Sequence, residues 1–227
     1  MKYDVRILDG LVFNGLGNSP VRSNIYVSGD RIARISLDAG LAADETISAS
    51  GLAVAPGFID THSHSDLLLF SDPFAKSKIT QGVTTEIVGQ DGFSVAPIRK
   101  EIQPELARYL SGLAGQLEDW KWGTFDSYLN RVSELHTAIN VASLVGNGTL
   151  RAITVGFDRR APSEEELEQM KLLLAEAMEQ GAVGISSGLI YALSSYADEN
   201  ELTELCTVAA RYGGVHVTHL RNEADRL

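Results

Sequence analysis

Residues 55–66 read APGFIDTHSHSD, and the pattern of the chain changes at this stretch. Before it, short runs rich in Val, Ile and Tyr are separated by turn residues such as Asp9-Gly10 and Gly29-Asp30, which is typical of strands joined by tight turns. After it, strand-length apolar runs alternate with amphipathic runs of helix length. The sequence therefore predicts a small antiparallel β module over residues 1–55 and an α/β domain over residues 56–227.

The strands of the first region are predicted at residues 3–8, 11–14, 25–28, 32–35 and 45–48. Those of the second region are predicted at residues 57–62, 85–89, 139–145, 182–186 and 214–219. Repeated strand–helix units imply a parallel sheet, which is either doubly wound or closed into a barrel. A closed (β/α)₈ barrel needs about 250 residues, and the second region is long enough for only five βα units. We therefore expect either the N-terminal part of such a barrel or a smaller open sheet.

Two helices are clear in the second region. Pro162-Ser163, followed by acidic residues, begins a helix that runs to about residue 180, where Gly181 ends it. Another helix spans residues 199–212 and ends at Gly213-Gly214. Residues 100–130 include two tryptophans and are too long for a simple crossover, so we expect an inserted helical excursion over the sheet.

Composition excludes several classes of protein. The 227 residues are 44% hydrophobic and 22% charged, an ordinary globular balance, and the formal net charge is −11. An acidic surface repels phosphate backbones and anionic lipids, so neither nucleic acid nor a membrane is an expected partner. The single cysteine, Cys206, excludes an internal disulfide framework, and no apolar run approaches the roughly 18 residues of a membrane-spanning helix. A cytoplasmic protein without a signal peptide is therefore expected.

His62 and His64 are the strongest candidates for a metal site. Residues two apart in a strand point to the same face, so both imidazoles are predicted to converge at the C-terminal end of the strand at 57–62, with Asp60 below them. Two imidazoles at this spacing suit a divalent metal of the zinc type. The alternative is a pair of surface histidines in a loop.

Two further candidates end other predicted strands. His219 ends the strand at 214–219, at the edge where the catalytic groups of α/β barrels gather, and is either a third ligand or a structural histidine. His216 faces the other way and is interpreted as packed between sheet and helix. Asp91 follows the strand at 85–89, and it either binds or bridges a metal or is simply a turn residue before Gly92.

Other positions carry weaker signals. Tyr191, in a loop after the strand at 182–186, either places its hydroxyl over the site or is a packed loop tyrosine. Residues 146–148, Gly-Asn-Gly, either bring backbone close to a ligand or form a turn. Glu86 lies in an apolar strand and needs a partner if it is buried. Cys206 is interpreted as a small buried apolar residue rather than a nucleophile or ligand.

Taken in order, four segments resemble the amidohydrolase superfamily, and within it the D-aminoacylases, or N-acyl-D-amino-acid deacylases. They read APGFIDTHSHSD, ITQGVTTEIVGQDGFSVAP, GAVGISSGLIYALSSYADENELTELCTVAARYGG and VTHLRNE. The resemblance covers essentially the whole chain. It implies a metal-dependent (β/α)₈ barrel with a small β-sandwich, of which residues 1–55 are the N-terminal part and residues 56–227 hold the first five βα units.

The resemblance also implies site residues. His62, His64 and His219 match metal ligands, and zinc is the expected ion. Asp91 stands where the family usually has a zinc-binding cysteine, so a hard oxygen replaces a soft thiolate, which leaves the identity and number of the metal ions open. Tyr191 is expected to stabilise the oxyanion of the reaction. Arg221, whose guanidinium fork suits a carboxylate, is expected to bind the substrate together with Tyr191. The family's sixth-strand histidine ligand and its catalytic aspartate match no residue here.

The implied function is hydrolysis of the amide bond of an N-acyl-D-amino acid, a small-molecule substrate, by the full-length enzyme. Because the proton-transfer aspartate and one ligand have no match, the 227-residue chain alone is expected to lack meaningful deacylase activity. Open sheet edges predict that it self-associates or pairs with a complementary C-terminal half. The alternatives are an amidohydrolase that acts on a cyclic amide or dipeptide, and a non-catalytic half-barrel that pairs with another chain.

Overall fold

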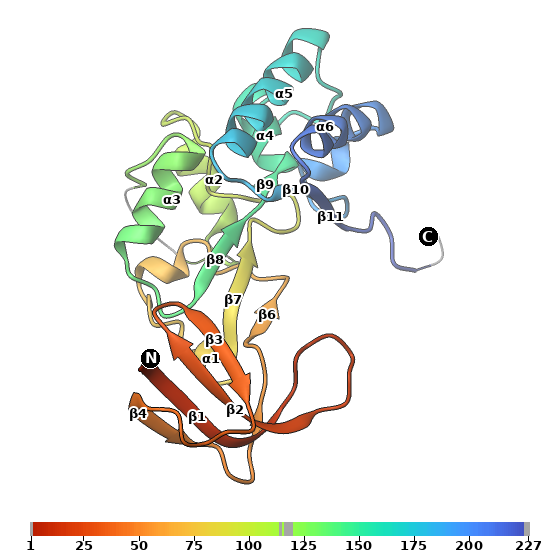
Figure 1. The fold of residues 1–227 in the computed structure, drawn as a ribbon. Coiled ribbons are helices and arrows are strands. Elements are labelled where there is room, and N and C mark those ends of the chain that lie inside the picture. Colours follow the sequence, from red (N-terminus) through yellow and green to blue (C-terminus); the bar gives the residue numbers. More distant parts are fainter. Residues whose placement is uncertain (1, 114, 116–119, 225–227) are drawn as a thin grey trace. The chain divides into compact units, whose positions relative to one another are not determined.

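The structure is a computed structural model that describes residues 2–113, 115 and 120–224. The chain divides into two compact units, Met1–Gly57 and Phe58–Leu227. The first holds one five-stranded sheet, and the second holds two three-stranded sheets with helices (Figure 1). Within the described residues, no helix is both long and apolar enough to cross a membrane.

The sheet of the first unit is built from β1 (Tyr3–Val12), β2 (Val21–Ser28), β3 (Arg31–Ser36), β4 (Ala43–Ser48) and β5 (Ala53–Val54). Its order is β3-β2-β1-β4, and β5 also pairs with β1. β1 is antiparallel to β2 but parallel to β4 and β5. The prediction of a purely antiparallel module is therefore wrong. Turn residues mark where β3 ends, but they do not show that the chain then crosses to the far edge of the sheet.

β1 spans most of the two strands that were predicted separately at residues 3–8 and 11–14. Asp9 has a φ of 60°, and the register of β1 with β2 shifts between Ile7 and Gly10. Asp9-Gly10 is thus a bulge inside one strand and not a turn between two strands. A Cβ on Gly10 would lie 2.6 Å from Val54 Cγ2, which explains why a glycine occupies this position.

The strands of the second unit are β6 (Phe58–Asp60), β7 (Val83–Val88), β8 (Asn140–Ser143), β9 (Val145–Gly146), β10 (Gly184–Gly188) and β11 (Val215–His219). The two sheets have the orders β6-β7-β8 and β9-β10-β11, and every pair is parallel. Only Leu144 separates β8 from β9. Its N–H donates to Val88 O at 3.0 Å, and Val183 N–H donates to Ser143 O at 3.0 Å. The strands therefore follow one another in chain order, as the sequence predicts for βα units.

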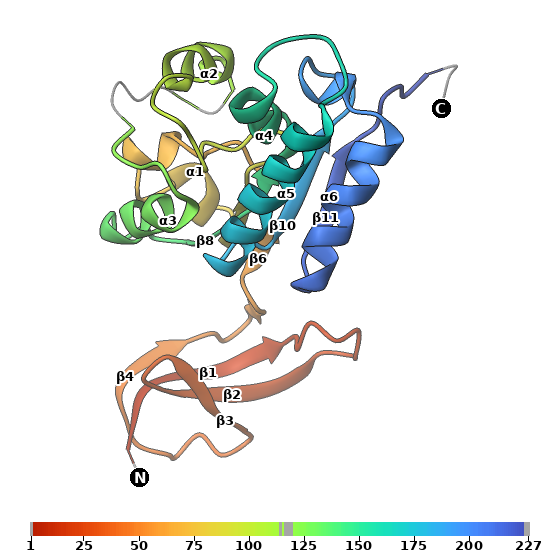
Figure 2. The same cartoon turned by 90° about the horizontal axis from the view of Figure 1, so that it is seen from above.

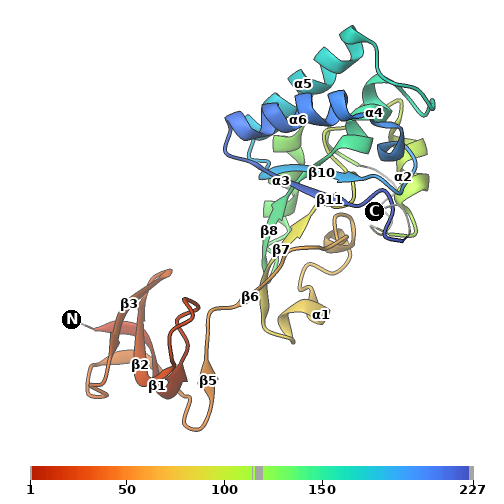
Figure 3. The same ribbon diagram turned by 90° about the vertical axis from the view of Figure 1, so that its right-hand side faces the viewer.

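The helices of the second unit are η1 (Leu68–Phe70), α1 (Lys76–Ile79), α2 (Gln103–Leu110), α3 (Phe125–Glu134), α4 (Asn147–Thr154), α5 (Glu164–Glu179), η2 (Ser194–Tyr196) and α6 (Glu199–Arg211). Figures 2 and 3 show α4, α5 and α6 on the same side of β10 and β11. The core between these layers contains Leu150, Leu174, Ile185 and Leu205, all buried.

Local signals explain where the helices begin. The Ser163 hydroxyl accepts from Glu166 N–H, and the Glu166 side chain bonds back to Ser163 N–H, which forms a capping box at the predicted start of α5. The predicted excursion at 100–130 contains α2 and the start of α3. Trp122 is buried and stacks on Trp120 with ring centroids 5.7 Å apart. Residues 114 and 116–119 of this predicted segment lie outside the described residues.

Candidate metal centre

The candidate site forms where β6 and β7 end. β6 ends at Asp60, two residues before the predicted strand does, so His62 and His64 lie in an irregular segment. Ser63 N–H still donates to Ile87 O at 3.1 Å, which keeps the segment beside β7. The alternation of a regular strand is therefore not what orients the two imidazoles.

Both imidazoles nevertheless face one carboxylate oxygen. His62 Nε2 lies 3.3 Å and His64 Nε2 lies 3.2 Å from Asp91 Oδ2, and the two rings are 5.2 Å apart at 72°. One ligand atom from each of the three residues, His62, His64 and Asp91, can be chosen so that all three atoms lie within 4.8 Å of one another. The Asp91 side chain is 7% exposed, that of His64 20% and that of His62 50%. The group is thus closed on the Asp91 side and open to solvent at His62.

The kind and spacing of these groups fit zinc. A tetrahedral zinc ion with ligand distances of about 2.0–2.1 Å holds its ligand atoms about 3.3–3.4 Å apart, close to both N···O distances here. Imidazole nitrogen and carboxylate oxygen are both zinc ligands. Burial lowers the pKa of His64, the Asp91 carboxylate opposes this, and His62 adds to it. The net lowering favours the neutral imidazole that a metal requires.

The backbone at Asp91 is unusual. Asp91 has a φ of 56° and stands between Gly89 and Gly92, whose φ angles are 75° and 80°. Aspartate tolerates the left-handed region better than most residues, and such a conformation persists only where the surroundings enforce it. A Cβ on Gly146 would lie 2.3 Å from Gly92 O, and one on Gly188 would lie 2.1 Å from Asp91 O. Gly146, the last residue of β9, thus makes room for the loop that carries Asp91, and residues 147–148 begin α4 rather than forming the turn that is one of the two expectations.

The structure does not bring His219 into the same group of ligand atoms, which consists of His62, His64 and Asp91. His219 ends β11 as predicted, and its ring lies 5.2 Å from the Tyr191 ring. Its Nδ1 lies 3.0 Å from Leu220 O, and its Nε2 lies 3.8 Å from Glu223 Oε1. The expected convergence of three imidazoles on one point is therefore limited to two.

Tyr191 and Arg221 lie on neighbouring loops. Burial raises the pKa of the Tyr191 hydroxyl, and the Asp91 and Glu223 carboxylates act in the same direction, so the hydroxyl stays a donor at neutral pH. Arg221 Nη1 donates to Ser195 O at 2.6 Å and Nη2 donates to Ala197 O at 3.0 Å. These two bonds occupy the guanidinium fork that the sequence assigns to a substrate carboxylate.

Sequence reasoning passed over two buried residues that connect the loops of the site. Asp66 Oδ1 accepts from Gly89 N–H at 3.0 Å, and burial raises the pKa of Asp66 to about 7. Gln90 Nε2 donates to Thr61 O at 2.8 Å, while its buried Oε1 has no partner among the described residues. Both residues lie inside segments that the sequence analysis quotes, but nothing in their spacing reveals these bonds.

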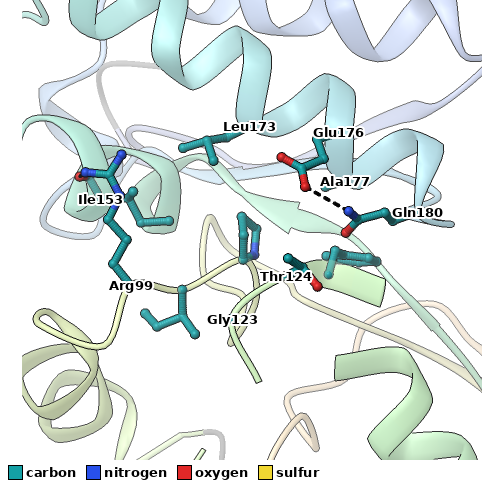
Figure 4. Close-up of a pocket in the computed structure, with 11 residues that line it drawn as sticks. Arg99, Gly123, Thr124, Ile153, Leu173, Glu176, Ala177 and Gln180 are labelled. Carbon is teal, nitrogen blue, oxygen red and sulfur yellow. Dashed lines mark hydrogen bonds between the residues drawn. The ribbon is translucent and has the colours of Figure 1, made fainter. Parts of the chain in front are cut away.

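A small pocket elsewhere is not a rival site. Figure 4 shows it between the start of α3, α4 and α5, and its volume is about 70 Å³. Two of its polar lining residues bond one another, because Gln180 Nε2 donates to Glu176 Oε1 at 2.9 Å; Gln180 Oε1 also accepts from Asp126 N–H, outside the lining, at 2.9 Å. None of the predicted site residues lines this pocket.

Comparisons with known proteins agree with the geometry. Residues 45–226 match the family model described as the amidohydrolase family. D-aminoacylase from Alcaligenes xylosoxydans xylosoxydans is 35% identical over 225 residues, which are 99% of this chain and 46% of that protein. N-acyl-D-glutamate deacylase from the same organism is 38% identical over 224 residues, which are 99% of this chain and 45% of that protein.

One solved structure is also similar over nearly the whole chain. It is the N-acyl-D-glutamate deacylase from Bordetella bronchiseptica, complexed with zinc and a phosphonate inhibitor that mimics the tetrahedral intermediate. It matches with a TM-score of 0.88 at 35% identity and covers 99% of this chain and 46% of that one. The chain thus spans about half the length of the relatives that it matches.

Proposed function

The chain belongs to the amidohydrolase family, and from this membership we propose that it forms part of a zinc-dependent hydrolase that deacylates N-acyl-D-amino acids. One observation carries the proposal: His62 Nε2 and His64 Nε2 converge on a single oxygen of Asp91. This arrangement occurs in a chain that is 35% identical to a D-aminoacylase and 38% identical to an N-acyl-D-glutamate deacylase. The similar Bordetella structure contains zinc.

The proposed architecture follows from strand order. Counting β8 and β9 as one strand interrupted at Leu144, five parallel strands follow one another along the chain with helices between them, which suits the first five units of a (β/α)₈ barrel. In this proposal residues 1–55 are one part of a small β-sandwich. Polypeptide that supplies the remaining barrel units is the complementary partner, either in the same molecule or in a second one.

Each site residue receives a role. His62, His64 and Asp91 would hold the ion, and His219 at the end of β11 is proposed as a further ligand. A zinc ion held there would supply Lewis acidity, which would polarise the acyl carbonyl and lower the pKa of a bound water to about 7. The Tyr191 hydroxyl donates a hydrogen bond to the oxyanion. For Arg221 the bonds to Ser195 O and Ala197 O favour a different task, which is to hold the loop that follows Tyr191.

Zinc binding by the chain tests the site directly. Protein freed of metal with a chelator is titrated with zinc, and bound metal is measured after dialysis. We expect the wild-type chain to retain zinc, and His62→Ala and His64→Ala to lose most of it. His136→Ala is the matched control, because His136 is exposed and belongs to no candidate group among the described residues. Equal zinc retention by all four proteins would refute the proposed site.

Substrate class needs a second measurement. The chain together with the polypeptide that completes the barrel is assayed with N-acetyl-D-amino acids, their L-enantiomers and hydantoins. The proposal expects chelator-sensitive release of D-amino acids in preference to the others. Preferred hydrolysis of a cyclic amide or a dipeptide would instead favour the alternative predicted from the sequence.

A further inference from the structure

We propose that Glu86 is a positioning residue, which fixes the loop of His62 and His64 in the shape that binds metal. The inference rests on the proposed metal site and deepens it. Glu86 lies on β7 in register with Asp60 of β6, and it has no exposed surface. A buried carboxylate is costly unless it is hydrogen-bonded and paired, so its partners indicate what it holds in place.

Both oxygens of Glu86 bind the histidine loop. Ser63 Oγ donates to Oε2 at 2.8 Å, and Ser65 Oγ donates to Oε1 at 2.5 Å. Ser63 and Ser65 are the two neighbours of His64 in the chain. The carboxylate therefore fixes His64 from both sides, through bonds that leave the imidazole itself free to bind a metal.

Lys78 extends this support to His62. Its Nζ lies 3.5 Å from Glu86 Oε2, donates to Ser63 Oγ at 3.1 Å and pairs closely with Asp60 Oδ2. The other oxygen of Asp60 accepts from His62 N–H at 3.1 Å. One lysine thus links two carboxylates, each of which holds the segment next to one of the histidines.

Other bonds hold the ends of the loop more than its histidines. Residues 61–65 are outside any strand or helix; Gln90 Nε2 donates to Thr61 O at 2.8 Å, Leu69 N–H donates to Ser65 O at 3.1 Å, and Ser63 N–H donates to Ile87 O of β7 at 3.1 Å. Without the carboxylate the segment would have to be ordered when the metal binds, and the lost conformational entropy would weaken binding. Supporting partners of metal ligands typically change metal affinity by about 10–100-fold when they are removed.

Three variants of the full chain test this role. Glu86→Leu removes every hydrogen bond of the carboxylate, whereas Glu86→Gln keeps an acceptor for one serine and gives a donor to the other. Leu174→Ala is the matched control, because it opens a cavity in the apolar core on α5, and residues 61–65 are not among the described residues of that core. Zinc affinity is measured by competition with a chromophoric chelator, and stability of the metal-free chain by urea unfolding.

We expect zinc affinity to fall about 10–100-fold in Glu86→Leu and less in Glu86→Gln, while Leu174→Ala loses stability but keeps wild-type zinc affinity. Wild-type zinc affinity in Glu86→Leu would overturn the inference. If Glu86→Leu does not fold, Ser65→Ala decides, because it removes a single bond: weaker zinc binding supports the role and unchanged binding refutes it. Failure of the metal site itself is seen separately, as zinc binding that does not depend on His62 and His64.

Discussion

Two buried carboxylates of the second unit, Glu86 and Glu201, are alike in burial and differ in surroundings. Glu201 on α6 pairs with Arg151 of α4, whose side chain is also fully buried, and accepts from Asn147 Nδ2 at 3.1 Å. Glu86 on β7 bonds two serine hydroxyls of an irregular loop and lies 3.5 Å from a lysine. We call Asn147, Arg151 and Glu201 the helix cluster, and Ser63, Ser65, Lys78 and Glu86 the loop cluster.

The comparison shows that burial of a charge does not by itself mark a functional residue. The helix cluster joins two regular helices that cover β10 and β11 (Figure 3), so its bonds hold elements that are already ordered. The loop cluster instead holds a segment whose shape is not set by secondary structure and which carries two candidate ligands. We therefore expect the helix cluster to govern stability and the loop cluster to govern zinc affinity.

The largest effect is expected in the helix cluster. Arg151→Ala leaves Glu201 buried without its cation, and breaking a buried pair in this way costs about 3–5 kcal/mol. Urea unfolding should show this loss, whereas the zinc affinity of the folded variant should stay near that of the wild type. Replacing both partners, as Arg151→Met with Glu201→Leu, should recover much of the stability. A zinc affinity as weak as that of Glu86→Leu would remove the distinction between the two clusters.

A smaller effect is expected where the Asp91 loop packs on β9. A Cβ at position 146 would lie 2.3 Å from Gly92 O and 2.5 Å from Phe93 N, both rigid backbone atoms. Gly146→Ala should therefore lower the free energy of unfolding by about 1–3 kcal/mol and, because it displaces the Asp91 loop, also weaken zinc binding. Gly112→Ala is the control, since a Cβ there meets nothing within 4 Å. If Gly146→Ala changes stability alone, the loop does not depend on this contact.

Much of the fold could be predicted from the sequence, because it depends on local signals. The start of α5 at Ser163, the start of α6 after Asp198 and the parallel strand order follow from caps and periodicity. The pairing of β1 with β4 was not predictable, because it depends on where the chain crosses and not on the residues within either strand.

The sequence identifies the residues of the candidate site, but it does not reveal the hydrogen bonds that hold them in place. His62, His64 and Asp91 stand at the ends of two neighbouring strands, and that placement brought them together as expected. The bonds from Ser63 and Ser65 to Glu86 join residues 23 and 21 positions apart, and no spacing rule identifies such a pairing. His219 ends β11 as predicted and lies outside this group of ligand atoms, so its role as a further ligand stays a prediction.

A third prediction tests whether the residue at position 91 contacts the metal ion. Asp91→Cys, made in a Cys206→Ser background so that the chain holds one thiol, replaces a hard oxygen with a soft thiolate. The ratio of zinc affinity to magnesium or manganese affinity should rise by on the order of tenfold over the wild type, which corresponds to about 1.4 kcal/mol. The left-handed backbone at Asp91 limits this gain, because cysteine tolerates it less well than aspartate. Unchanged metal preference would show that residue 91 does not contact the ion.

The smallest effect concerns His216, which belongs to neither cluster and has no charged partner among its described contacts. His216 is exposed on β11, so the prediction that it packs between sheet and helix is wrong. Its Nε2 lies 2.9 Å from Ser187 Oγ, and partial desolvation lowers the pKa of His216 below its usual 6.5. Above pH 6.5 the ring is neutral in both the folded and the unfolded chain, so His216 costs no stability there. As the pH falls below 6.5, the unfolded chain binds the proton first, and the free energy of unfolding decreases until the pH passes the folded pKa.

His216→Gln should therefore flatten the dependence of unfolding free energy on pH between about 7 and 5, by at most one proton taken up on unfolding. The urea midpoint is measured at several pH values with a chelator present, so that zinc contributes nothing. All other ionisable groups are the same in both proteins, so their contributions cancel when the two slopes are compared. Identical slopes would show that His216 takes up its proton equally in the folded and unfolded chain. A flatter slope would show that a single partly desolvated histidine on β11 can make stability depend on pH without belonging to either polar cluster.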